Sequence, residues 1–230
     1  MTREFIGTRL LKADLDFGPG IRRPLIADQR LKSTPTHKGN PRAWTFFFDG
    51  GFVGVIKFPP HSAAVLSDLH LQRIECGVQR PEISDFDRSH ALILTYKNAE
   101  LIASCRAEFQ EHSPVEISGI YEEIVGRENI SDYFYCSRLS VKKSVASNGV
   151  INYLFYLLEF IGRSEGKSAV VANCLYRIRR FYESKGFRIE DSWKFQHPVL
   201  HNESIVMIKP QDDLFFRAIG KGAWMEESEE

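Results

Sequence analysis

The chain has 230 residues, of which 43% are hydrophobic and 26% are charged, as expected for one α/β domain with an additional arm. Its 30 basic and 30 acidic residues cancel, which argues against a nucleic-acid-binding role. No apolar run reaches the roughly 18 residues that a membrane-spanning helix needs, and the first residues lack the apolar core of a signal peptide. We therefore expect a cytoplasmic protein.

The cysteines and histidines predict neither disulfides nor a metal site. The cysteines are widely separated and contain no Cys-x-x-Cys pair, so we interpret them as buried thiols in a reducing cytosol. The histidines show no metal-ligand spacing, so no bound metal is expected. The cysteines are Cys76, Cys105, Cys136 and Cys174.

Residues 1–42 are rich in glycine and proline and have little periodic pattern, so we expect an irregular N-terminal arm. Residues 44–58 are predicted to form a β-hairpin, because two apolar runs flank Asp49-Gly50-Gly51 and glycine supplies the positive φ angles of such a turn. The next expected elements are a helix over 61–76, strands over 91–96 and 101–107 that form a second hairpin, and a short helix near 120–125.

The stretch from Phe134 to Arg188 has the order of a βαβα unit. Gly186 follows its last helix, as is typical of a residue beyond a helix C-terminus. The expected elements are strands over 134–141 and 169–172 and helices over 149–161 and 175–184. Candidates after this stretch are strands over 187–189 and 204–208, a helix over 212–218, and an acidic, frayed tail over 223–230.

The order of motifs in this stretch resembles the GCN5-related N-acetyltransferase (GNAT) superfamily. The matching features are Leu139-Ser140-Val141 on a strand, a loop to Gly149, the apolar helix after it, Asn173, and Phe181-Tyr182-Glu183-Ser184-Lys185-Gly186-Phe187. The resemblance covers about residues 90–209. It implies an α/β acyltransferase domain over 43–222, with a mixed, splayed central sheet of about seven strands flanked by helices and an N-terminal extension.

A thioester cosubstrate follows from the resemblance and has a physical basis. The amides at a helix N-terminus bind phosphate, so the backbone of Ser147, Asn148 and Gly149 is expected to hold the pyrophosphate of coenzyme A or the phosphate of a phosphopantetheine arm. Lys142 and Lys143 add positive charge.

The splayed strands are expected to bind the rest of the cosubstrate. The amides of Leu139 and Val141 would bind the pantetheine and stabilise the oxyanion, and Asn173 is assigned to the same cosubstrate. Tyr182 is the expected general acid for the leaving thiolate, with packing under the next strand as the alternative.

The phosphate-binding loop departs from the superfamily's usual Arg/Gln-x-x-Gly-x-Gly/Ala. The aligned segment begins with Ala146 and ends with Ile151, and only Gly149 matches. This departure argues against ordinary acetyl-CoA use.

Three further motifs resemble a subgroup, the acyl-homoserine lactone (autoinducer) synthases and the related N-acyl amino acid synthases. Their pattern is Asp-x-Phe-Asp, Gly-x-x-Arg and Glu-x-Ser-Arg, and those enzymes usually take the acyl group from acyl carrier protein. The corresponding segments are Asp85-Phe86-Asp87, Ala103-Ser104-Cys105-Arg106 and Cys136-Ser137-Arg138. Cys136 is assigned to the glutamate position and the aromatic N-terminal block is not evident, so a homoserine lactone product is not predicted.

The resemblance implies roles for four charged residues. Arg106 and Arg138 would bind the carboxylate of the acceptor, and Asp85 and Asp87 would hold its ammonium group or take its proton. The alternative is that these four residues form a structural ion-pair network.

A basic run near the C-terminus would dock an acidic acyl carrier protein, or simply form a solvated helix face. Its members are Arg177, Arg179, Arg180, Lys185 and Arg188.

We expect an N-acyltransferase that moves an acyl group from an acyl-carrier-protein or coenzyme A thioester to the amine of an amino acid or similar small molecule. One alternative is an acetyl-CoA-dependent N-acetyltransferase of a small molecule or protein. The other is a degenerate, non-catalytic GNAT-fold binding module.

Overall fold

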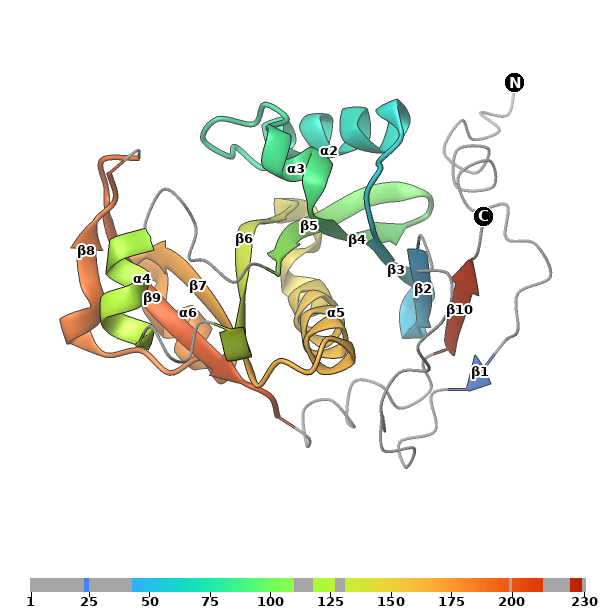
Figure 1. The fold of residues 1–230 in the computed structure, drawn as a ribbon. Coiled ribbons are helices and arrows are strands. Elements are labelled where there is room, and N and C mark those ends of the chain that lie inside the picture. Colours follow the sequence, from blue (N-terminus) through green and yellow to red (C-terminus); the bar gives the residue numbers. More distant parts are fainter. Residues whose placement is uncertain are drawn as a thin grey trace, which may run out of the picture. The chain divides into compact units, whose positions relative to one another are not determined.

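The computed structural model describes residues 23–24, 43–109, 118–126, 131–198, 200–212 and 224–228 (Figure 1). The chain comprises two compact units. Unit 1 comprises Met1–Arg106, Arg138–Leu157 and Leu214–Glu230, and unit 2 comprises Ala107–Ser137 and Leu158–Asp213. The expected arm lies outside the described residues except for the short strand β1 (Arg23–Pro24), and the helix expected over 212–218 lies almost wholly outside them.

Both predicted hairpins of unit 1 are confirmed. Strands β2 (Ala43–Phe48) and β3 (Phe52–Lys57) are antiparallel, and Gly50 and Gly51 between them have φ of 75° and 74°. Strands β4 (Ala91–Lys97) and β5 (Glu100–Glu108) are joined by a two-residue turn. The strand order in unit 1 is β1-β10-β2-β3-β4-β5, followed by the C-terminal part of β6 (Tyr133–Val141).

The expected acidic tail is partly a strand. Trp224–Ser228 forms β10, which pairs antiparallel with β2 from Trp224↔Phe47 to Ser228↔Ala43. The hydropathy pattern and the net charge of this segment did not predict a strand. An edge strand forms because its backbone groups hydrogen-bond to a neighbouring strand, and that neighbour is distant in the sequence.

Two helices cover opposite faces of the unit 1 sheet (Figure 1). The predicted helix is confirmed as α2 (Ala63–Glu75), whose N-cap Ser62 accepts a hydrogen bond from the amide of Val65. Its buried apolar residues Val65, Leu66 and Leu69 belong to one core cluster with residues of β3, β4 and β5. The first part of α5 (Val150–Ser164) packs on the other face, where Tyr156 and Leu157 contact residues of β2 and β3.

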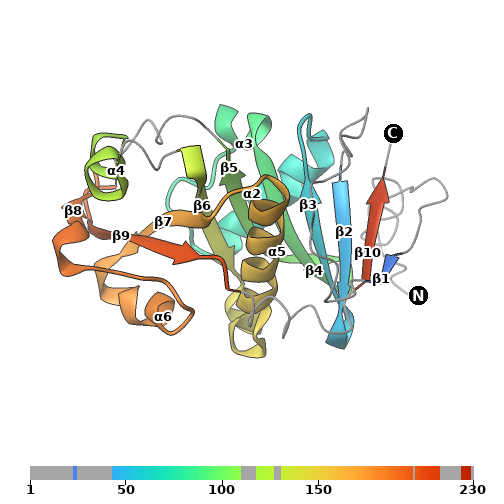
Figure 2. The same ribbon diagram turned by 60° about the horizontal axis from the view of Figure 1, so that its bottom comes forward.

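Unit 2 continues from the N-terminal part of β6 in the order β6-β7-β9-β8. Strand β7 (Ala169–Leu175) is parallel to β6 and antiparallel to β9 (Glu203–Pro210). Helices α4 (Ser118–Val125) and α6 (Arg179–Glu183) lie on opposite sides of β7 and β9 (Figure 2). A parallel pair needs a long crossover connection, and α5 supplies it.

Three details of unit 2 differ from the prediction. The expected helix over 175–184 is shorter, because β7 extends to Leu175 and a 3-10 turn (Tyr176–Ile178) precedes α6. The strand expected over 187–189 is a single bridge, Arg188↔Ile208. The short strand β8 (Lys194–Gln196) was not predicted, because three residues carry too little alternation to be recognised.

The prediction of a mixed α/β sheet flanked by helices is confirmed. Cys105, Cys136 and Cys174 are buried free thiols, as expected, and Cys76 is half-buried. Among the helices of the described residues, none is long and apolar enough to span a membrane.

Candidate active site

The buried carboxylate of Asp87, in unit 1, accepts five hydrogen bonds. Asp87, on the short helix α3 (Asp85–Ser89), accepts two hydrogen bonds from Arg73, at 2.9 and 2.7 Å. Arg106 donates to the same carboxylate at 3.2 Å, and the amide and hydroxyl of Ser84 both donate at 2.9 Å. Asp87 and Arg73 are fully buried, so this is a buried ion pair in which both carboxylate oxygens accept hydrogen bonds.

The electrostatic surroundings keep Asp87 ionised. Burial alone would raise the pKa of its carboxyl group, but the hydrogen bonds and charge of Arg73 outweigh it, with help from the Ser84 amide and the charge of Arg106. The pKa of Asp87 is therefore well below its ordinary value. A carboxylate held in this way is a poor proton acceptor, and its position favours a role in fixing the two arginines.

The structure brings only two of the four predicted charged residues together. Arg106 contacts Asp87, as the ion-pair alternative requires. Asp85 is exposed in the first turn of α3, where its carbonyl accepts a hydrogen bond from Ser89.

Arg138 instead holds the loop between α2 and α3. Its Nη1 donates to the carbonyls of Gln79 and Arg80, at 3.1 and 2.8 Å. Its own backbone has a φ of 56°, a left-handed conformation that is uncommon for a residue in a strand. Such a backbone angle redirects the side chain locally, so β6 is distorted at Arg138.

Arg73 and Gln72 were not among the predicted site residues. They end a helical stripe on the buried face of α2, with Val65, Leu66 and Leu69 before them. The sequence signal that could have identified them is their position at the end of an apolar helical stripe. Polar side chains on a buried helix face need hydrogen-bonding partners in the interior.

Gln72 connects α2 to two strands through a buried triangle of polar groups. Its Oε1 accepts hydrogen bonds from Ser104 of β5 at 2.9 Å and Ser140 of β6 at 3.0 Å. The two hydroxyls are themselves 3.0 Å apart. This network fixes the C-terminal part of β6 to the rest of unit 1.

The loop predicted to bind phosphate leads directly into a helix. Lys143–Asn148 forms a 3-10 turn, Gly149 has a φ of 73°, and α5 begins at Val150. Glycine adopts this angle at little cost, whereas other residues lose about 1–2 kcal/mol there. The backbone of Ser147, Asn148 and Gly149 thus precedes the helix N-terminus, as predicted; the phosphate itself stays a prediction.

The two lysines before this loop have different surroundings. The ammonium group of Lys142 contacts the carboxylates of Glu75 and Glu100, the latter at 2.7 Å. Burial would lower the pKa of Lys142, but these two partners raise it above its ordinary value. Lys143 is exposed and is therefore the better candidate for a phosphate contact.

The parallel pairing of β6 with β7 covers part of each strand. Register pairs run from Tyr133↔Ala169 to Cys136↔Ala172, whereas β6 continues to Val141 and β7 to Leu175. Leu139 and Val141 are half-buried and lie beyond the last of these pairs.

Asn173 lies one residue past the last pair, and its side chain is hydrogen-bonded within unit 2. Its Oδ1 accepts a hydrogen bond from the hydroxyl of Tyr135 at 2.7 Å.

Tyr135, rather than Cys136, occupies the glutamate position of the synthase motif. In a Glu-x-Ser-Arg spacing that ends at Arg138, the glutamate position is three residues earlier. That position is Tyr135, so its assignment to Cys136 was wrong.

Tyr182 lies on α6 with its ring packed among aromatic side chains. It is 8% exposed, and its ring makes edge contacts with Phe181 at 5.2 Å and Phe187 at 5.5 Å between centroids. The ring is therefore held in a fixed orientation; its role as a general acid stays a prediction.

Comparison with solved structures identifies the fold. The CoA-dependent acyl-homoserine lactone synthase MesI matches with a TM-score of 0.51 and 18% identity, over 69% of this chain and 87% of that one. The CoA-dependent acyl-homoserine lactone synthase BjaI, with SAM and isopentyl-CoA, matches with a TM-score of 0.51 and 11% identity, over 69% and 81%.

A protein from Desulfovibrio desulfuricans, assigned to the GNAT family of acetyltransferases, matches with a TM-score of 0.50 and 11% identity, over 70% of this chain and 99% of that one. No protein-family model matches the chain, and a search of curated proteins finds no significant match. At these identities the likeness concerns the fold. The protein therefore has the GNAT fold, and acyl-homoserine lactone synthases are among its structural neighbours.

Proposed function

We propose that this protein is an N-acyltransferase that uses a thioester donor and a small primary amine as acceptor. The observation that carries the proposal is the β6–Gly149–α5 segment, in which a left-handed glycine leads a strand into a fifteen-residue helix. The first amides of such a helix are a ready site for phosphate. The fold of acyltransferases gives this segment its chemical context.

The proposed reaction is direct transfer. The acceptor amine attacks the thioester carbonyl, the tetrahedral intermediate collapses, and the thiolate leaves. The amides of Leu139 and Val141 are assigned to the pantetheine and the oxyanion, and Tyr182 to the protonation of the thiolate.

Arg106 and Arg138 are our candidates for binding the acceptor's carboxylate, because a guanidinium group matches carboxylate geometry. Asp87 supports this role indirectly, since it fixes Arg106 in place. An amino acid or a similar amine with a carboxylate is therefore the proposed acceptor.

The first test is mass spectrometry of organic extracts from cells that overexpress the chain, beside cells that express Tyr182→Phe. New acylated amines should be produced by the wild type, and the variant should produce about 10²–10⁴-fold less if the phenol is the general acid. Phenylalanine keeps the aromatic packing, so thermal unfolding of the purified variant serves as the folding control. If neither this extract nor purified protein with acetyl-CoA yields an acylated amine, the proposed activity is refuted.

The surface around α6 favours acyl carrier protein over free coenzyme A as donor. Arg177 and Arg180 are exposed, and the apolar side chains of Ile178 and Phe181 between them are 42% and 44% exposed. Arg179 stacks on Tyr176 instead, with 4.1 Å from its guanidinium carbon to the ring centroid. Exposed cations interleaved with apolar groups suit an acidic protein partner.

A charge-reversal variant tests the donor. Arg177→Glu with Arg180→Glu should slow transfer from acyl carrier protein at least tenfold at low salt, while transfer from the same acyl-CoA changes little. Arg88→Glu, an exposed arginine on α3, is the matched control. Equal rates with acyl carrier protein before and after the reversal would remove this surface from the proposal.

A further inference from the structure

The C-terminal end of α2 contacts the end of β6 at two positions, and the first is the side chain of Gln72. Gln72 is 2% exposed, and its Oε1 accepts hydrogen bonds from the hydroxyls of Ser104 and Ser140. Its Nε2 donates to the carbonyl oxygen of Ser140 at 3.4 Å and to Sγ of Cys76 at 3.1 Å. One side chain of α2 therefore contacts both the hydroxyl and the backbone of Ser140.

The second position is Lys142, the residue that follows β6. Its ammonium group contacts the carboxylates of Glu75 on α2 and Glu100 on β5. Its amide donates to the carbonyl of Ile102 on β5 at 2.8 Å. Lys142 is also the N-cap residue of the 3-10 turn that leads to Gly149 and α5. The same contacts therefore fix the beginning of the loop that is predicted to bind phosphate.

Val141 lies between these two positions, and its amide is one of those assigned to the thioester. Side chains alternate between the faces of a strand, so Ser140 and Lys142 share the face toward α2. Backbone groups alternate within the plane of the sheet, and the amide of Lys142 points to β5. The amides of Val141 and of Leu139 are therefore directed away from β5. Rotation of β6 about its axis would change this direction, and the contacts of Ser140 and Lys142 oppose such a rotation.

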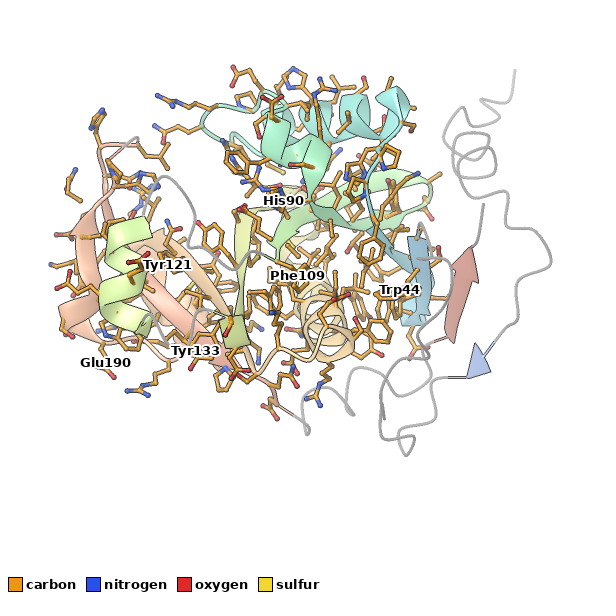
Figure 3. The ribbon with its side chains drawn as sticks, viewed as in Figure 1. Trp44, His90, Phe109, Tyr121, Tyr133 and Glu190 are labelled. Atoms are coloured by element: carbon orange, nitrogen blue, oxygen red, sulfur yellow. The ribbon has the colours of Figure 1, made fainter. Side chains whose placement is uncertain are left out.

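These polar contacts supply an orientation that the apolar core does not. The apolar residues of α2 pack in a cluster with residues of β2 to β5, and Figure 3 shows the side chains between the helix and these strands. Apolar contacts are non-directional, whereas hydrogen bonds restrict both distance and angle. Polar groups in the interior are also costly unless they are paired. The network around Gln72 therefore suits a role in fixing the direction of β6.

We propose that Gln72 and Lys142 are positioning residues for the thioester donor, which hold β6 so that the amides of Leu139 and Val141 face the pantetheine and the thioester carbonyl. This inference rests on the proposed N-acyltransferase function. Neither side chain is assigned a contact with the donor. Lys142 acts through its two carboxylate partners, and the phosphate is left to Lys143 and the backbone amides. A displacement of about 1 Å in such a site can cost about 10²-fold in rate.

The first measurement is hydrogen–deuterium exchange of the free protein, which requires neither a donor nor activity. Gln72→Met keeps the length and the unbranched shape of the side chain but removes its hydrogen bonds. Exchange over residues 139–142 should become at least about tenfold faster, while exchange in β2 and β3 stays the same. Ser104→Ala is the matched control, because it removes one hydrogen bond to Gln72 but keeps both contacts with Ser140. Its effect on this segment should be smaller.

The second measurement is steady-state transfer, with octanoyl-CoA and octanoyl-acyl carrier protein as donors and the free amino acids as acceptors. Gln72→Met should lower kcat/KM for the donor by about 10²-fold and leave the KM of the acceptor nearly unchanged. A merely structural role would instead reduce the fraction of folded protein, and so kcat, without changing the KM of either substrate.

A double variant, Glu75→Gln with Glu100→Gln, tests the role of Lys142. The two carboxylates are 56% and 63% exposed, so the variant should fold. It releases the ammonium group of Lys142 and removes two negative charges. If Lys142 positions β6, kcat/KM for the donor should fall about two- to fivefold, the size expected for exposed ion pairs. If Lys142 instead binds the phosphate directly, kcat/KM for the donor should rise, which would overturn its assignment.

Unchanged exchange over 139–142 in Gln72→Met would overturn the inference, and so would faster exchange with an unchanged kcat/KM for the donor. Ser140→Ala covers the case in which Gln72→Met fails to fold. It removes only the hydroxyl on β6 and should change both measurements in the same direction. If the wild type acylates none of these acceptors with either donor, the proposed function fails and the inference with it. Altered exchange in an active enzyme whose donor kinetics do not change refutes the inference alone.

Discussion

Replacing Asp87 by asparagine is expected to lower the free energy of unfolding by about 3–5 kcal/mol. This is the usual cost of removing one charged partner from a buried ion pair. Asparagine has nearly the same shape, so little packing is lost. The loss is electrostatic, because the fully buried guanidinium of Arg73 keeps its charge without the carboxylate that it contacts at 2.7 Å.

Asp85→Asn is the matched control for this variant. It changes the same residue type on the same helix, but Asp85 is exposed, so the effect should stay within about 0.5 kcal/mol. Urea unfolding at neutral pH measures both. Equal midpoints for the two variants would show that the buried ion pair does not stabilise the fold.

The destabilisation of Asp87→Asn should also depend on pH. The pKa of Asp87 is lowered in the folded state, so its contribution is fully present above the unfolded-state pKa of about 3.9. It is lost as the pH falls from there through the lower, folded-state pKa. The difference between wild type and variant should therefore be constant from pH 7 to pH 5 and shrink below about pH 4. A difference that stays constant into the acid range would contradict the ion-pair assignment.

Leu157→Ala is expected to lower the free energy of unfolding by about 2–5 kcal/mol. Leu157 is fully buried on α5, where its methyl groups cover Gly54 of β3. The change removes apolar contacts and leaves a cavity between the helix and the sheet. Because the same helix begins after Gly149, we also expect weaker stabilisation by thioester donors.

Gly54→Ala tests the other side of this contact. A Cβ atom at Gly54 would lie 2.7 Å from Leu157 Cδ1 and 2.9 Å from Phe48 Cε2, so the single change should cost about 1–3 kcal/mol. In the Leu157→Ala background the added methyl group meets less obstruction, and its cost should fall. A double-mutant cycle from denaturant unfolding measures this coupling, and strict additivity would mean that the two residues do not touch.

The elements predicted most accurately are those whose signal is local. The Asp49-Gly50-Gly51 turn, the hairpin of β4 and β5, and the stripe of α2 each depend on residues close in the chain. The glycine before α5 belongs with them, since its left-handed φ of 73° is a local requirement.

The elements that were missed depend on distant neighbours. Strand β10 forms only because β2 offers it an edge, and β8 only because β9 does. Arg73 was overlooked as a site residue because its partner Asp87 is fourteen residues away on another helix.

The sequence by itself determined the mixed α/β sheet, the order of the βαβα segment and the acyltransferase resemblance. These predictions depend on hydrophobic periodicity and on turn residues, which are both properties of residues close together in the chain. The tertiary structure alone decided which charged side chains are buried in ion pairs and which are exposed to solvent. Asp87 and Asp85 have the same side chain and lie two positions apart, yet one is buried against two arginines and the other is exposed. Burial and partners set the energy of a charge, and both depend on which distant segments the fold brings together.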